Sequence, residues 1–124
     1  KTAEKIAENK PSVLPDYGWI YFASNPNLFH YDANMDKHVP LYKIGYTNME
    51  TPQLRLDRLY KTGLPSPFVL KFAKKVKHSH GKEQIIHKIL EKCRLNDNRE
   101  FFTVNQEEVR NLFNLIDGEW YNST

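Results

Sequence analysis

Two stretches of aromatic and β-branched residues near the start of the chain constrain its fold most. Residues 17–23 read Tyr-Gly-Trp-Ile-Tyr-Phe-Ala, and residues 41–46 read Leu-Tyr-Lys-Ile-Gly-Tyr. Both compositions are typical of strands, in which such side chains pack well on a pleated surface. Because the two stretches follow each other in the sequence, they are predicted to pair antiparallel. Residues 24–40, rich in Asn, Asp, Pro and His, are predicted to form a long loop between them.

The middle of the chain carries one helix signal and one further strand. Thr51 followed by Pro52 predicts the N-cap and first position of a helix that ends near Tyr60, before Gly63. Residues 68–77 alternate in polarity and predict a third strand. One face is expected to carry Phe68, Leu70, Phe72 and Val76, and the other Val69, Lys71, Ala73, Lys75 and Lys77.

Two more helices are predicted in the last third of the chain. Residues 82–93 place Ile86, Ile89, Leu90 and Cys93 on one helical stripe. Residues 100–104 are predicted to be a short extended piece. Asn105 is then expected to cap a final helix, with Glu108 as its capping-box partner.

This order of elements predicts an α+β fold, with a small central antiparallel sheet of about three strands flanked by helices. Residues 1–16 are polar and are broken by Pro11 and Pro15, so they are expected to be a tail or a linker to further domains. Residues 17–117 are expected to be the compact domain, and residues 118–124 a C-terminal tail.

Composition bounds the class of protein. A length of 124 residues fits one domain, and seven Tyr, seven Phe and two Trp supply the bulky side chains of a core. The single Cys93 excludes an internal disulfide, so an intracellular location, in the cytoplasm or nucleus, is expected. No apolar run approaches the roughly 18 residues of a membrane span, so no membrane partner is expected. The net charge of +3 permits nucleic acid as a partner without demanding it.

Glu83 is a polar residue where an apolar one belongs. It precedes Ile86 by three residues and Leu90 by seven, which places it on the core-facing stripe of its helix, and His87 follows four residues later on the same side. Two interpretations stay open: a boundary position favoured by the helix dipole, or a metal-ligand pair. The neighbouring His78 and His80 add zinc as an alternative, although structural zinc favours thiolate-rich sets of four ligands.

Three basic residues are ambiguous in the same way. Lys43 lies inside an otherwise aromatic strand, where it either snorkels to solvent or faces outward. Arg55 and Arg58 lie one turn apart on the first predicted helix, where most arginines are solvated. Gly45, two residues after Lys43, would let a backbone or ligand come close.

Taken together, these residues resemble the GIY-YIG nuclease superfamily. The matching pieces are Gly18-Trp19-Ile20-Tyr21, Tyr42-Lys43-Ile44-Gly45-Tyr46-Thr47, Arg55-Leu56-x-x-Leu59, Thr62-Gly63-Leu64-Pro65-x-Pro67-Phe68, Glu83-x-x-x-His87 with Arg94, and Arg99-Glu100-Phe101-Phe102. The Lys-Ile-Gly form of the second motif resembles the phage- and virus-associated DNA-binding branch. The resemblance covers residues 17–113 and rests on the ordered set of pieces.

The resemblance implies a one-metal phosphodiesterase that cuts DNA. Tyr21 corresponds to the tyrosine near the nucleophilic water, and Lys43 stands where the second motif usually begins with tyrosine, preceded by Tyr42. Arg55 corresponds to the helix arginine, and Glu83 to the sole protein ligand of Mg²⁺ or Mn²⁺. Supporting positions are Tyr42, Gly45, His87 and Glu100, and Asn105 is the candidate for the family's final asparagine.

Phosphodiester hydrolysis explains why such residue types would be used together. The reaction needs an activated water and neutralised phosphate oxygens. A lone carboxylate suffices for Mg²⁺ when waters and substrate phosphate complete its shell. Arg55 can clamp a phosphate through two hydrogen bonds, and the Lys43 ammonium would favour the phenolate of Tyr21. DNA phosphates outside the site are expected to contact the basic residues Lys71, Lys74, Lys75 and Lys77.

The sequence therefore favours a metal-dependent endonuclease domain acting on duplex or branched DNA, in a protein of viral or phage type. Two alternatives remain: a DNA-binding module of the same fold without catalytic activity, and a zinc-stabilised interaction domain.

Overall fold

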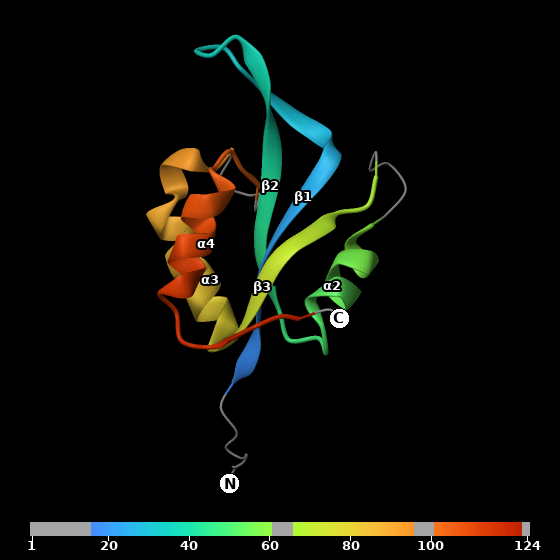
Figure 1. The fold of residues 1–124 in the computed structure, drawn as a ribbon, viewed down its shortest axis with the longest axis vertical. Helices are drawn as coiled ribbons and strands as arrows, with labels where there is room; N and C mark the ends of the chain where they lie inside the picture. The colour runs from blue at the N-terminus through green and yellow to red at the C-terminus, as the bar shows by residue number, and fades with distance from the viewer. Residues whose placement is uncertain (1–15, 61–65, 96–100, 123–124) are drawn as a thin grey trace, which may run out of the picture.

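The computed structural model describes residues 16–60, 66–95 and 101–122 of the chain. Its elements are β1 (Tyr17–Asp32), β2 (Lys37–Thr47), α2 (Pro52–Leu59), β3 (Val69–Lys77), α3 (Ser79–Ile89), the 3₁₀ helix η1 (Glu91–Cys93), β4 (Phe101–Phe102), α4 (Gln106–Asn114) and β5 (Glu119–Trp120). Figure 1 shows α3 and α4 on one side of the strands and α2 on the other. Within the described ranges, no helix has the length and apolar character that crossing a bilayer requires.

The sheet has five antiparallel strands in the order β4-β2-β1-β3-β5, where about three were predicted. The two additional strands, β4 and β5, are two residues long each and lie at the sheet's edges. A strand this short has no readable alternation, so its pairing comes from the neighbour it meets in space. β5 lies within residues 118–124, the segment predicted to be a tail.

The predicted loop over residues 25–40 is instead largely a continuation of the β1–β2 hairpin, which corrects the sequence prediction. After a register shift between Ser24 and Phe29, four further pairs run from Phe29↔Pro40 to Asp32↔Lys37. The turn is held by the Asp32 carboxylate, which accepts hydrogen bonds from the backbone N–H groups of Asn34 (2.9 Å) and Met35 (3.3 Å). Polar residues thus close a hairpin here, although their β propensity is low. Figure 1 shows the hairpin projecting from the body of the domain.

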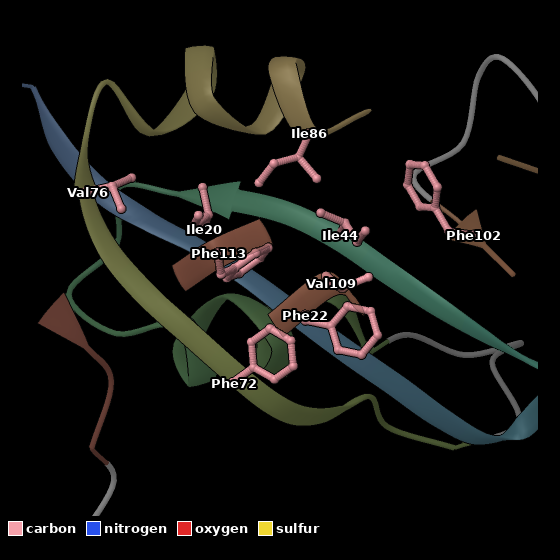
Figure 2. Packing of buried hydrophobic residues seen from close by; sticks show 9 residues of the cluster. All are labelled: Ile20, Phe22, Ile44, Phe72, Val76, Ile86, Phe102, Val109 and Phe113. Carbon is pink, nitrogen blue, oxygen red and sulfur yellow. The ribbon is translucent and has the colours of Figure 1, made fainter. Parts of the chain in front are cut away.

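Alternation along β1 divides the interior into two layers. Ile20 and Phe22 point to the side of α3 and α4, here called the α3/α4 face, whose core is Ile20, Phe22, Ile44, Phe72, Val76, Ile86, Phe102, Val109 and Phe113 (Figure 2). Tyr21 and Ala23 point to the opposite side, here called the α2 face, where they pack with Leu56, Phe68 and Ala73. Each face therefore has its own apolar cluster, and β1 contributes to both.

A β-bulge in β3 overturns the simple alternation predicted for residues 68–77. Phe22 faces Phe72, but the next residue of β1, Ala23, faces Leu70, so Lys71 is the extra residue on β3. Phe68 and Leu70 consequently pack on the α2 face, while Phe72 and Val76 pack on the α3/α4 face.

The predicted helix starts are largely confirmed. The Thr51 hydroxyl accepts from the Leu54 N–H at 3.2 Å, and Pro52 is the first residue of α2. Asn105 caps α4 by accepting from the Glu108 N–H at 3.1 Å. The helix predicted over residues 82–93 differs from its prediction: α3 begins at Ser79 and ends at Ile89, and the chain then tightens into η1 as far as Cys93. Gly63 lies outside the described residues.

Candidate nuclease site

Tyr21 lies in the middle of the central strand, directly between two small residues. Its partners in register are Gly45 on β2 and Ala73 on β3. Neither partner has a side chain beyond Cβ, which leaves room for the phenol ring beside them. The ring packs in the α2-face cluster and is 1 % exposed. Gly45 is therefore explained by its place opposite the tyrosine.

Lys43 lies on the same face of the sheet as Tyr21. It faces Ala23 in register, two residues along β2 from Gly45, so it is diagonal to Tyr21. Diagonal partners in an antiparallel pair have Cα atoms roughly 7–8 Å apart, within reach of long side chains. The Lys43 ammonium lies 5.9 Å from the ring centroid of Phe101, and the residue is half-buried. Lys43 therefore lies against the sheet surface beside Phe101 and is not on a fully solvated strand face.

Helix α2 covers this same face and brings Arg55 to it. Leu56 is buried in the cluster that contains Tyr21, and the adjacent Arg55 is half-buried, whereas Arg58 is exposed. Of the two arginines, Arg55 is therefore the less exposed.

Glu83 and His87 form a buried pair on α3, on the other side of the sheet. They are 3 % and 7 % exposed, and Glu83 Oε2 lies 3.9 Å from His87 Nε2. His87 Nε2 is also 2.8 Å from the carbonyl oxygen of Ile44, and its ring centroid is 5.0 Å from that of Phe102 on β4. The predicted place of Glu83 on the core-facing stripe is confirmed, and burial this deep exceeds that of a simple boundary position.

The two groups of candidate residues meet at one short stretch of β2. Lys43 and Gly45 belong to the α2 face with Tyr21, while the carbonyl of the intervening Ile44 contacts His87. Tyr21 and Lys43 thus lie on one face of the sheet, and helix α2, which carries Arg55, packs on that face. Glu83 and His87 lie on the other face, joined to the first group through the backbone of Ile44.

Among the described residues, no group of three or more His, Cys, Asp or Glu could hold a metal ion. This leaves the zinc alternative without a ligand set there, and His80 instead stacks on Tyr46 with ring centroids 4.4 Å apart. A Mg²⁺ ion that keeps its waters and takes phosphate oxygens from DNA needs only one or two carboxylates. The buried, negatively ionisable Glu83 beside a histidine fits that sparser kind of site.

The remaining predicted residues have mixed placements. Tyr42 stacks on Phe22 with centroids 4.6 Å apart, so it belongs to the α3/α4 face and not to the side of Tyr21. The Asn105 side chain serves as the cap of α4. Glu100 lies outside the described residues.

The lysines of β3 do not all face solvent. Lys71, Lys75 and Lys77 are exposed, but Lys74 is only 5 % exposed and its ammonium donates to the carbonyl of Phe113 at 3.0 Å. The same ammonium lies 4.9 Å from the ring centroid of Trp120. Burial lowers the pKa of Lys74, and the nearby Asp117 partly offsets this. This placement argues against the prediction that Lys74 contacts DNA, because its ammonium already donates to the Phe113 carbonyl inside the protein.

Sequence reasoning overlooked two aromatic residues, Tyr17 and Trp19, as functional candidates. They lie on the α2 face of β1, opposite Lys77 and Lys75 respectively. Their spacing of two residues is visible in the sequence, but the lysines opposite them depend on the strand register.

Comparison with known proteins gives one match. A family model described as the T5orf172 domain matches residues 18–117. Neither the curated proteins nor the solved structures yield a match.

Proposed function

The chain belongs to the T5orf172 family, a phage-associated, nuclease-like DNA-binding domain related to the GIY-YIG fold, and from this premise we propose that it is a metal-dependent DNA endonuclease. The reaction is hydrolysis of a phosphodiester in DNA. Residues 18–117 would contain the whole catalytic unit.

The observation that carries the proposal is the arrangement around Lys43 and Ile44 on β2. A tyrosine, a lysine and the helix of a half-buried arginine share one face, and a buried glutamate–histidine pair contacts the same strand from α3. Core packing alone does not require two ionisable side chains, 3 % and 7 % exposed, side by side on an apolar helix face.

Each candidate residue of the site has a role that its side-chain chemistry suits. Arg55 binds the non-bridging oxygens of the scissile phosphate and neutralises the charge that develops on them. The Tyr21 phenolate oxygen orients the attacking water and accepts its proton, which leaves Tyr21 as the neutral phenol. Lys43, diagonal to Tyr21, favours the phenolate that this proton transfer requires.

Glu83 would hold the metal ion, with His87 beside its carboxylate at 3.9 Å and bound to the Ile44 carbonyl of β2. When bound, Mg²⁺ or Mn²⁺ would supply charge stabilisation to the phosphate and the leaving oxygen.

A specific observation favours a second candidate, a DNA-binding module without cleavage. Tyr21 and Glu83 are 1 % and 3 % exposed, so both are shielded from a substrate in this conformation. Binding through the exposed lysines of β3 would require neither of them.

Cleavage by a Glu83→Gln variant separates the two candidates. We expect the wild-type chain to cut labelled DNA with Mg²⁺ or Mn²⁺ and to stop when EDTA is added. Glu83→Gln should lose at least 100-fold in single-turnover rate, because the amide cannot hold the ion as a carboxylate does. The matched control is Glu91→Gln, an exposed position of η1 that should cut normally.

Melting curves of both variants would confirm that they are folded. Cutting by Glu83→Gln at the wild-type rate would refute the metal assignment. Metal-independent DNA binding with no cleavage of any DNA form would favour the binding module.

A further inference from the structure

A row of aromatic side chains and lysines crosses the α2 face at the start of β1. Tyr17 stands directly opposite Lys77 on β3, and Trp19 directly opposite Lys75. Tyr17 is 48 % exposed, and both lysines are exposed. The Lys75 ammonium lies 5.9 Å from the ring centroid of Trp19. Trp19 therefore has a cation beside its ring, and the exposed Tyr17 has a lysine as its register partner.

This row leads to the candidate site. Tyr17, Trp19 and Tyr21 are alternate residues of one strand and so share a face, at steps of roughly 6.8 Å for two residues of strand. Trp19 is fixed in place, since its indole N–H donates to the carbonyl of Glu50 at 3.1 Å and its ring meets that of Tyr121 edge-on at 5.2 Å. The row therefore continues the strand face that carries Tyr21, with Trp19 held in place.

The surface beside the row is hollowed. A pocket of about 440 Å³ is lined by Tyr17, Lys75, Gly118 and Glu119. The backbone at Gly118 passes so close to β3 that a Cβ there would lie 2.9 Å from Val76 Cγ1 and would overlap the Lys75 carbonyl. The glycine thus lets β5 form the wall of the pocket against β3.

We propose that this row binds a single-stranded segment of DNA beside the cleavage site, so that the substrate is DNA with unpaired bases, such as a flap or a fork. The inference rests on the proposed function. Aromatic faces stack on bases, and bases offer their faces only where the strand is unpaired. Lys75 and Lys77 would neutralise the phosphates of the same strand.

The charges on this surface also differ from those of a surface that binds DNA only through its phosphates. Glu119 on β5 is the register partner of Lys75, which places a carboxylate at the rim of the pocket. A duplex brings two phosphate strands to such a rim, whereas a single strand can place its phosphates on the lysines and turn its bases toward the rings. The row therefore fits one strand better than two.

Fluorescence anisotropy with three labelled probes tests the proposal. The probes are a 15-nucleotide oligothymidine, a blunt DNA duplex and a forked DNA. Tyr17→Ala should weaken oligothymidine and fork binding about tenfold, as expected for the loss of one stacked base. Its duplex affinity should stay within a factor of two. The matched control is Tyr60→Ala, which removes a tyrosine of similar exposure (47 %) at the end of α2, and it should change none of the three affinities.

A second readout does not depend on any variant. Oligothymidine should quench the fluorescence of Trp19, measured in a Trp120→Phe background, and the duplex should not. Equal losses on all three probes in Tyr17→Ala, or no loss and no quenching, would overturn the inference while leaving nuclease activity to stand. Absence of binding to every probe by the wild-type chain would overturn both this inference and the proposed function.

Discussion

Lys74 is a single residue whose burial carries a measurable pH signature. Its ammonium donates to Phe113 and lies over Trp120, on the apolar side of β3. Because burial lowers the pKa of Lys74 in the folded chain, the unfolded chain binds more protons at pH values below the ordinary 10.5. By linkage, this residue's contribution to the free energy of unfolding becomes more favourable as pH rises toward that value.

We therefore expect the free energy of unfolding of the wild-type chain to rise, relative to that of Lys74→Met, between pH 7 and 10.5. Urea denaturation of the two proteins across this range measures the difference, and taking the difference cancels the other lysines and the tyrosines. A constant difference would mean that folding does not change the pKa of Lys74. Near pH 7 the variant loses one hydrogen bond, worth about 1 kcal/mol, and is relieved of a buried charge.

Residue placement could be predicted from the sequence where helical spacing decides it. Glu83 was placed on a core stripe by its distance from Ile86 and Leu90, and it is buried. Strand alternation likewise places Lys74 on the side of Phe72 and Val76, yet its charge led to the prediction that it contacts DNA phosphates. Its partner, the Phe113 carbonyl, lies 39 residues away, and no local pattern contains that information.

At the scale of elements, Gly18 lies where the start of β1, the end of β2 and the start of α3 pack closely together. A Cβ at this position would collide with the Asn48 and Ser79 side chains and would lie 2.8 Å from the Thr47 carbonyl oxygen. The backbone oxygen cannot move without disturbing the β1–β2 pairing at Trp19↔Thr47. This glycine of the first motif is thus required by packing.

Gly18→Ala should therefore lower the free energy of unfolding by about 1–3 kcal/mol, the usual cost of overpacking. Gly81→Ala is the matched control: it lies in the first turns of α3, where the nearest atom to a Cβ would be His78 Cβ at 4.0 Å. There alanine should stabilise by about 0.5–1 kcal/mol, because glycine is costly inside a helix. Chemical denaturation of both variants gives the comparison. Equal effects of the two substitutions would remove the packing argument.

Helix starts were predictable because caps are local. Thr51 and Asn105 each act on an N–H three residues later. β4 lies within the extended piece predicted over residues 100–104. The β3 bulge, the hairpin over residues 29–40 and β5 were missed because they depend on partners far along the chain. At the candidate site, the sequence supplied the residue types, but only the fold shows that Glu83 and Tyr21 lie on different faces.

On the scale of the whole molecule, the net charge is only +3, but positive charge is concentrated locally. Lys71, Lys75 and Lys77 are exposed on β3. Each phosphate neutralised on duplex DNA contributes about −0.9 to the slope of log affinity against log salt. With three such lysines, we expect this slope to be about −2.7.

Lys75→Gln should make that slope shallower by about 0.9. Lys74→Met should leave it unchanged, since the buried ammonium has no access to phosphate. Titrations of a labelled duplex at several salt concentrations test both expectations. An unchanged slope in Lys75→Gln, or a shallower one in Lys74→Met, would contradict the assignment of the DNA-contacting lysines.

The central position of β1 in the strand order has a consequence for how the chain acquires its structure during synthesis. The hairpin partner of β1 ends at Thr47, so one edge of β1 can be paired early. Its other edge must wait for β3, which ends at Lys77. During that interval the strand with Ile20, Tyr21 and Phe22 presents an open backbone edge, which is a template for association between chains. A ribosome-bound chain that stalls before residue 77 is accordingly the form of this protein most exposed to aggregation.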